Sequence, residues 1–250
     1  MKSQSNPSHG RVVTTEAATF LNLFLGSIGA LVFLRLAGKV KKGQTDSFDQ
    51  RILASLRDPK NPELLKGPPW VTEVAHDVTA LGSGANLSVI TGIVVGYLAL
   101  NRRFRAAGFL IASLGSGMAV SRLLKDLFVR PRPTVVPKLT HFDPGSFPSG
   151  HSMLSALVYL TLGGILSRMA ANAAAKIYFR TVAITLAMSV GVSRLLLGVH
   201  YPTDVLAGWA AGSLWSGLCS QLARSLQRRG TVERPIPATE TTTTPVAMGA

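Results

Sequence analysis

Six long apolar blocks dominate this sequence, and they constrain its fold more than any other feature. A helix needs about 20 mostly apolar residues to cross a hydrocarbon core about 30 Å thick. Strands in globular proteins are shorter, commonly about 3–10 residues. The blocks therefore predict membrane-spanning helices, and the Gly, Ala and Ser residues within them would let neighbouring helices pack closely. They are Ala17–Leu36, Leu87–Leu100, Ala106–Leu124, Met153–Met169, Tyr178–Val199 and Val205–Leu222.

The composition agrees with this interpretation. Of the 250 residues, 47% are hydrophobic and only 15% are charged, whereas a soluble domain has roughly 25% charged residues. The apolar content excludes a disordered chain, and the single cysteine, Cys219, excludes a disulfide-stapled scaffold. The net charge of +14 leaves a nucleic-acid binder or a membrane protein with basic loops. Six soluble helices would need polar faces that these blocks lack, so we favour the membrane protein.

We predict an all-α polytopic membrane protein, a bundle of six transmembrane helices in one domain over residues 17–222. Residues 1–16 form a polar N-terminal segment, and residues 223–250 form a basic and then Thr- and Pro-rich disordered tail. The first block is longer than the apolar core of a signal peptide, and no small-residue cleavage site follows it. It is therefore predicted to be a retained helix.

A long connection, residues 38–76, separates the first two blocks and is expected on the extracytoplasmic side. Its residues Phe48, Ile52, Leu53 and Leu56 recur at helical spacing. This spacing indicates a short helix, which is either amphipathic and lies on the membrane surface or is simply solvated.

Basic residues in the short loops predict the orientation of the bundle, because cytoplasmic loops carry an excess of Lys and Arg. An even number of spans places both termini and the short basic loops on one side. We predict that this is the cytoplasmic side of the inner (plasma) membrane. The basic residues concerned are Arg102, Arg103, Arg105, Arg168, Lys176, Arg180, Arg224, Arg228 and Arg229.

Three polar stretches fall on the opposite, extracytoplasmic face, because the spans alternate in direction. The first follows the third block, the second opens the fourth block, and the third links the fifth block to the sixth. We expect the three to converge on one pocket. Together they contain Lys125, Arg132, Ser149, Gly150, His151, Arg194, His200 and Asp204.

The residue types in this pocket suit phosphoryl transfer. Arg and Lys side chains hold phosphate oxygens, and the free N–H groups of a helix N-terminus attract a phosphate. Asp204 can fix the tautomer of His200 and leave the other ring nitrogen as a nucleophile. His151 can then act as general acid on the leaving group. This set of groups predicts a phosphohistidine intermediate that water hydrolyses.

The three stretches resemble the signature motifs of the type 2 phosphatidic acid phosphatase family, which also includes the vanadium haloperoxidases. The motifs are complete and in the family's order, and the six blocks extend the resemblance over residues 17–222. The resemblance implies a six-helix bundle with its site near the outer surface and chemistry without a metal or other cofactor. It implies His200 as nucleophile, Asp204 as its orienting partner and His151 as acid. The phosphate would be held by Lys125, Arg132, Ser149, Gly150 and Arg194.

Some of these residues also have simpler interpretations. Ser149 and Asp204 could each cap a helix. Upstream, the sequence Asp77-Val78-Thr79-Ala80-Leu81-Gly82 resembles an additional stretch of bacterial family members. Asp77 and Thr79 could instead cap the second helix, and the sequence leaves both interpretations open.

We expect an integral-membrane lipid phosphatase that hydrolyses a phosphomonoester or diphosphate of a lipid such as phosphatidic acid, phosphatidylglycerophosphate or undecaprenyl diphosphate. Its partners would be this substrate and membrane lipids. Nucleic acid is not expected, because the basic residues are split between two faces without an aromatic platform. The alternatives are a vanadate-dependent haloperoxidase-like enzyme and a non-catalytic protein that binds or transports lipid phosphates. The choice of lipid and the oligomeric state stay open.

Overall fold

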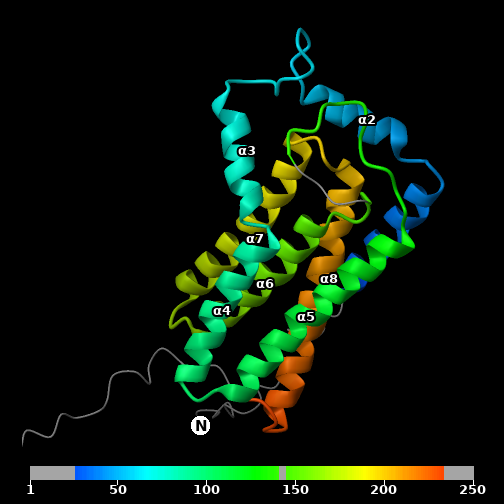
Figure 1. The fold of residues 1–250 in the computed structure, drawn as a ribbon. Helices are drawn as coiled ribbons and strands as arrows, with labels where there is room; N and C mark the ends of the chain where they lie inside the picture. Colours follow the sequence, from blue (N-terminus) through cyan, green and yellow to red (C-terminus); the bar gives the residue numbers. More distant parts are fainter. Residues whose placement is uncertain (1–25, 141–144, 234–250) are drawn as a thin grey trace, which may run out of the picture.

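A computed structural model describes residues 26–140 and 145–233 of the chain (Figure 1). Within these residues the regular secondary structure is helical, apart from one isolated bridge between Arg57 and Leu65. Residues 26–41 are helical. They are followed by α2 (Asp46–Ser55), α3 (Trp70–Ala80), α4 (Gly84–Leu100), α5 (Phe104–Leu127), α6 (Gly150–Met169), α7 (Ala173–Leu196) and α8 (Pro202–Arg228).

The apolar blocks fall on helices wherever the structure describes them, which confirms the all-α prediction for those residues. Three helices, α5, α6 and α7, are long and apolar enough to span a membrane, and α3 with α4 forms a bent fourth candidate with a 50° break. The described residues therefore show three to four candidate spans. α8 is not among them, and its buried small residues, which include Ala207, Ala211 and Ser216, face the bundle.

The outer surface of the bundle is apolar, as expected for contact with lipid. Ile93 on α4 is 69% exposed, and Ile111 on α5 and Ile184 on α7 are more than half exposed. Soluble monomers rarely expose large contiguous apolar patches.

The connection over residues 38–76 is more structured than the sequence indicated. The predicted short helix is α2, and because one of its faces packs against the protein it is not simply solvated. Asp49 and Leu53 are buried against the protein, while Phe48 and Ile52 are exposed. The connection also contains the start of α3, which the spacing of its apolar residues did not reveal. α3 begins directly after two prolines, which suit a helix start, and it packs along α7.

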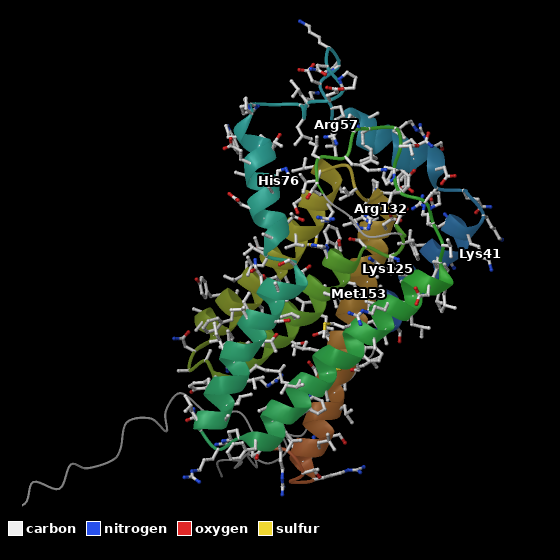
Figure 2. All side chains as sticks on the ribbon, viewed as in Figure 1. Lys41, Arg57, His76, Lys125, Arg132 and Met153 are labelled. Carbon is white, nitrogen blue, oxygen red and sulfur yellow. The ribbon has the colours of Figure 1, made fainter. Side chains whose placement is uncertain are left out.

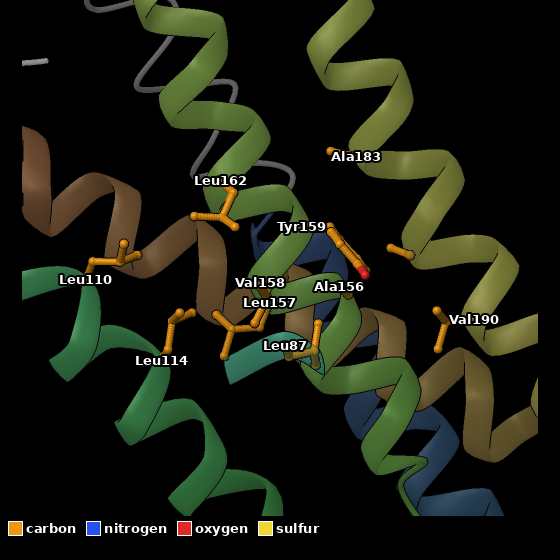
Figure 3. Packing of buried hydrophobic residues seen from close by; sticks show 11 residues of the cluster. Leu87, Leu110, Leu114, Ala156, Leu157, Val158, Tyr159, Leu162, Ala183 and Val190 are labelled. Atoms are coloured by element: carbon orange, nitrogen blue, oxygen red, sulfur yellow. The ribbon is translucent and has the colours of Figure 1, made fainter. Parts of the chain in front are cut away.

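The core forms around α6, which packs against both α7 and α8. Figure 3 shows α6 between Leu110 and Leu114 of α5 on one side and Val190 of α7 on the other. Two glycines bring α8 close to α6. A Cβ on Gly208 would come within 2.7 Å of the Ser149 carbonyl oxygen, and a Cβ on Gly212 would collide with a carbonyl one turn further along α6. Small residues thus allow the two backbones to touch.

The bundle has two distinct ends (Figure 1). At one end, α2 lies beside the segment after α5 and the start of α8, which it contacts through Asp49. The other end holds the α4–α5 and α6–α7 loops and the end of α8. The basic residues that predicted the cytoplasmic side lie toward this second end.

Candidate active site

The eight predicted site residues lie at the end of the bundle that α2 covers. They come from the last turn of α5, the segment after it, the first turn of α6, the last turn of α7 and the start of α8. Figure 2 places Lys125 and Arg132 at this end, near Met153 of α6. The charges of Arg194, Lys125 and Arg132 all act on His151, and the His200 ring lies near it as well. The structure therefore brings the three polar stretches together.

His200 and Asp204 form a buried pair, with exposed fractions of 1% and 0%. His200 Nδ1 lies 3.5 Å from Asp204 Oδ2, slightly longer than a good hydrogen bond, and has no nearer partner among the described residues. Asp204 Oδ2 also accepts the backbone N–H of Tyr201 at 2.9 Å, at the N-terminus of α8. The same carboxylate therefore caps α8 and faces His200, so the capping role does not exclude the predicted role in orienting His200.

The other ring nitrogen of His200 faces a cation. Nε2 lies 3.1 Å from Arg132 Nη1, which also donates to the Val199 carbonyl oxygen at 2.6 Å. A guanidinium only donates, so Nε2 accepts and Nδ1 carries the ring hydrogen. Burial, together with the charges of Arg132 and Arg194, lowers the pKa of His200 to about 4, although Asp204 opposes this shift. At neutral pH the ring is uncharged and has a lone pair at Nε2.

This pKa predicts how stability depends on pH. Between pH 6.5 and about 4 the unfolded His200 takes up a proton that the folded residue does not. The free energy of unfolding should therefore fall as the pH drops through this window. We expect the Tm in detergent to fall from pH 7 to pH 4, and His200→Asn to reduce that slope. A slope that His200→Asn leaves unchanged would contradict the lowered pKa.

The first turn of α6 is built to hold an anion. Ser149 is the N-cap, and its Oγ accepts from the Ser152 amide at 3.4 Å and the Ser152 hydroxyl at 2.9 Å. Its own hydroxyl hydrogen can therefore donate to a ligand. A Cβ at Gly150 would lie 3.4 Å from Lys125 Nζ, so glycine lets this ammonium approach the helix N-terminus. The Ser149 N–H donates to the Asp204 carbonyl oxygen at 3.0 Å, which ties this turn to α8.

The stretch from Asp77 to Gly82 contributes to the same site. Arg194 is only 3% exposed, and its Nη1 donates to Thr79 Oγ1 at 2.8 Å. A Cβ at Gly82 would collide with Val190 and come within 3.4 Å of the His151 ring. The N-cap of α4 is Ser83, so the capping interpretation of Asp77 and Thr79 is wrong. The stretch instead positions groups around Arg194 and His151.

We predict that Thr79→Val lowers kcat/KM for phosphate release about ten-fold, because a hydrogen bond to a charged group contributes about 1.5–3 kcal/mol. Valine keeps the shape of threonine but cannot accept from Arg194. Thr79→Ser restores the hydroxyl and should recover most of the activity. Steady-state kinetics of both variants tests this, and equal losses in the two would mean that packing, and not the hydroxyl, matters at this position.

Sequence reasoning missed Arg130 and Ser146, which both bind Asp204. Arg130 Nη1 donates to Asp204 Oδ1 at 2.6 Å, and the Ser146 hydroxyl donates to Oδ2. Burial lowers the pKa of Arg130, but the carboxylates of Asp204 and Asp49 outweigh it, and the pKa is raised. Nη1 also donates to the Thr203 hydroxyl oxygen at 2.9 Å. The sequence Arg130-Pro131-Arg132-Pro133 shows two arginines one residue apart, but no local pattern indicates which of them binds Asp204.

Comparison with known proteins identifies the family. The PAP2 superfamily matches residues 106–228, which contain all eight predicted site residues. Phosphatidylglycerophosphatase B of Bacillus subtilis (strain 168) is 31% identical over 185 residues, which cover 74% of this chain and 87% of that protein. The chain belongs to the PAP2 superfamily. This confirms the family that the sequence motifs predicted.

Two further relatives extend the comparison. A crystal structure of a transmembrane PAP2 type phosphatidylglycerolphosphate phosphatase from Bacillus subtilis superposes with a TM-score of 0.73 at 29% identity, covering 82% of this chain and 98% of that one. Lipid A 1-phosphatase of Rhizobium etli is 30% identical over 173 residues, which cover 60% of this chain and 70% of the relative. These PAP2 relatives are phosphatases, which confirms the predicted enzyme class. The candidate spans and the transmembrane relative show a membrane protein.

Proposed function

We propose that this PAP2 protein is a lipid phosphatase that works through a phosphohistidine at His200. One observation carries the proposal: His200 is buried with Nδ1 toward Asp204 and Nε2 3.1 Å from the guanidinium of Arg132. When the Arg132 guanidinium donates to the phosphate oxygens instead, the Nε2 lone pair that it held is released and lies beside the phosphorus atom that it attacks.

The reaction proceeds in two steps. In the first, His200 Nε2 bonds to phosphorus while the bond from phosphorus to the lipid oxygen breaks, and His151 gives its proton to that oxygen. Asp204 accepts the Nδ1 hydrogen bond and stabilises the positive ring. In the second step water attacks phosphorus, His151 takes the proton, and the phosphorus–nitrogen bond breaks to release phosphate. His200 returns to its starting state.

The phosphate oxygens bind to five groups that surround the reacting phosphorus. Cationic side chains and backbone N–H groups in a buried site stabilise the charge that develops in the transition state, and each contact of this kind is worth a large factor in rate. The site also requires no metal in this proposal. The groups are the side chains of Lys125, Arg132, Ser149 and Arg194 and the amide of Gly150.

A groove between α4, α5 and α6 suits the hydrocarbon chain of the substrate. It holds about 300 Å³ and is lined almost entirely by apolar atoms, among them Leu87, Met118 and Leu157. Its α6 wall begins at Leu154, one turn from His151, and it runs from there toward the middle of the bundle. A lipid can thus place its chain between these helices while its phosphate reaches the first turn of α6.

We predict that Gly115→Phe fills this groove and lowers kcat/KM for a long-chain lipid about ten-fold. The phenyl ring would take the space proposed for the lipid chain, and packing both into it would cost about 1–3 kcal/mol. Gly115 lines the groove, and a Cβ there has no neighbour within 4 Å. Gly108 on the same helix is equally open but lies outside the groove, so Gly108→Phe is the matched control. Hydrolysis of p-nitrophenyl phosphate should be unaffected in both variants. Equal losses on the lipid in both would refute the groove.

We propose six spans in the inner (plasma) membrane, with the helix of residues 26–41 and α8 added to the candidates. Both termini would be cytoplasmic and the site would face the extracytoplasmic side. The loop arginines at the end opposite the site support this orientation. In a Cys219→Ser background, Lys60→Cys should react with a membrane-impermeant maleimide in intact cells, whereas Asn101→Cys should not. The reverse pattern would place the site in the cytoplasm.

The function is tested with purified protein in detergent and a panel of phosphatidic acid, phosphatidylglycerophosphate, lipid A and undecaprenyl diphosphate. We expect phosphate release from at least one lipid, and the same rate in the presence of EDTA. The described residues contain no group of three or more His, Cys, Asp and Glu side chains that could hold a metal, and metal independence stays a prediction until this measurement. Absence of release from every lipid would overturn the proposal.

A further inference from the structure

Arg130 is a buried cation that the proposed mechanism does not use. Its side chain is only 8% exposed, yet its guanidinium contacts three carboxylates. Nη1 lies 2.6 Å from Asp204 Oδ1, and Nη2 lies 2.8 Å from Asp49 Oδ2 and 3.2 Å from Asp46 Oδ1. The guanidinium also stacks over the ring of Tyr201, 4.2 Å from its centroid. A planar guanidinium that bridges two buried carboxylates is held in one orientation.

Asp49 fastens α2 to the first turn of α8. It has no exposed surface, and its Oδ1 accepts the Thr203 N–H at 3.0 Å. Its Oδ2 accepts the Thr203 hydroxyl at 2.6 Å as well as Arg130. Burying a carboxylate is costly unless such partners are in place. Asp46, on the same helix, has a 56% exposed side chain and lies at the edge of the group.

The two oxygens of Asp204 have different partners. Oδ1 accepts from Arg130, whereas Oδ2 accepts from Tyr201 N–H and the Ser146 hydroxyl and faces His200 Nδ1. Arg130 therefore fixes the rotation of the carboxylate so that Oδ2 is the oxygen presented to His200. Arg132 contacts the opposite side of the same ring, so one arginine contacts His200 directly and the other contacts the carboxylate that faces it.

We propose that Arg130 and Asp49 are positioning residues that hold Asp204 in the orientation and charge that His200 needs. This inference rests on the proposed function, since it gives both residues a part in that reaction. Both act through Asp204 and neither binds the phosphate. Arg130 holds Asp204 Oδ1, so that Oδ2 stays directed at His200 Nδ1. Asp49 takes up part of the charge of Arg130, so that Asp204 still attracts the Nδ1 hydrogen of His200.

The two positions have opposite effects on the charge of His200. Loss of the Arg130 cation leaves the Asp204 carboxylate beside the ring without its counter-cation, which favours the protonated form of the ring and raises the pKa of His200. Loss of the Asp49 charge strengthens the hold of Arg130 on Asp204 and lowers that pKa. Both changes reach His200 through Asp204, because an opposite charge beside a titratable group favours its charged form and the hold of Arg130 on Asp204 sets how much of that charge the ring feels. The other charged or titratable groups around this pair, Lys125, Arg132, His151, Arg194 and Tyr201, stay the same in both variants.

Histidine labelled with ¹³C at Cε1 reports this charge directly in the full-length protein in detergent. The chain has five histidines, and His200→Asn assigns the signal. From a wild-type midpoint of about 4, Arg130→Met should raise the midpoint by about one unit or more, and Asp49→Asn should lower it. Arg130→Lys restores the charge and should keep the midpoint near the wild-type value. Asp46→Asn, the exposed control on the same helix, should leave it unchanged.

Activity on the best lipid substrate provides the second measurement. Arg130→Met should lower kcat on the order of 100-fold, because breaking a buried charge pair leaves a carboxylate without its partner. Arg130→Lys should recover only part of this loss, since an ammonium cannot donate to both carboxylates as the guanidinium fork does. Asp46→Asn should keep the wild-type kcat.

Equal or same-direction shifts of the His200 midpoint in Arg130→Met and Asp49→Asn would overturn the inference and leave the pair a purely structural link between α2 and α8. A shift in Asp46→Asn as large as that in Asp49→Asn would do the same. If Arg130→Met loses its thermal transition, Arg130→Lys and Asp49→Asn decide the question. Failure of the proposed function is separate, because wild type would then release no phosphate while the His200 titration remains readable.

Discussion

Alanine in place of His200 is expected to abolish phosphate release, lowering kcat by about 10⁴-fold or more, as removal of a catalytic nucleophile does elsewhere. In the proposed mechanism His200 Nε2 bonds to phosphorus, and within residues 26–140 and 145–233 no other histidine has a carboxylate facing its ring in this way. The remaining cations can still bind the substrate, so the loss should appear in kcat more than in KM. His76 is exposed on α3, and His76→Ala is the matched control.

The same variant tests the intermediate. Rapid acid or base quenching of wild type with ³²P-labelled lipid should trap label on the protein with the stability of a phosphoramidate, lost in acid and kept in base. His200→Ala should trap none. His151→Ala should form the labelled species slowly, because the leaving oxygen then lacks its proton donor. Label retained by His200→Ala would show that another residue is the nucleophile.

Arg194→Ala is expected to lower kcat about 10²–10³-fold, the range found when one donor to a developing negative charge is removed. Arg194 is 3% exposed in the last turn of α7 and is held by Thr79, so its guanidinium is fixed before substrate arrives. Preorganised donors act mainly on the transition state, and KM should change less than kcat. Arg194→Lys should recover a minor part of the loss, because an ammonium cannot bind two phosphate oxygens in the same plane.

Arg180 provides the control for Arg194. It lies on the same helix toward the opposite end and is exposed, so Arg180→Ala removes the same charge without touching the site. Kinetics on the preferred lipid should separate the two variants by at least about ten-fold in kcat. Comparable rates in the two would mean that Arg194 contributes only net charge, and its assignment as a phosphate ligand would fail.

The motif residues could be placed from sequence because helix direction alternates along the chain. Lys125 ends one helix, Ser149 begins the next, and His200 follows the third, so a simple up-and-down topology brings them to one end. Contacts between distant segments could not be placed in this way. Asp49 and Arg130 are 81 positions apart, and Thr79 and Arg194 are 115 apart. Their meeting depends on how α2 and α3 dock, which local spacing does not encode.

The spans were easier to locate than to delimit. α8 continues to Arg228, past its expected end at Leu222, and α7 starts at Ala173 instead of Tyr178. Helices continue through polar residues at their ends, where the side chains reach water. The first block begins within residues 1–25, which lie outside the described part of the chain. The N-terminal segment and residues 234–250 of the predicted tail also lie outside it.

The Ser149 amide donates a hydrogen bond to the Asp204 carbonyl oxygen, and the α8 glycines pack closely beside it. These contacts join the first turn of α6, where the phosphate is proposed to bind, to the first turn of α8, which carries the carboxylate that faces His200. In the proposed mechanism the phosphoryl group moves only from the lipid oxygen to His200 Nε2 and then to water. The groups that bind it can therefore stay in place through both steps. Selection among lipids then falls to parts that vary independently of these groups. Exchanging α4, which lines the groove, between relatives with different substrates should change the lipid preference and leave the chemistry intact.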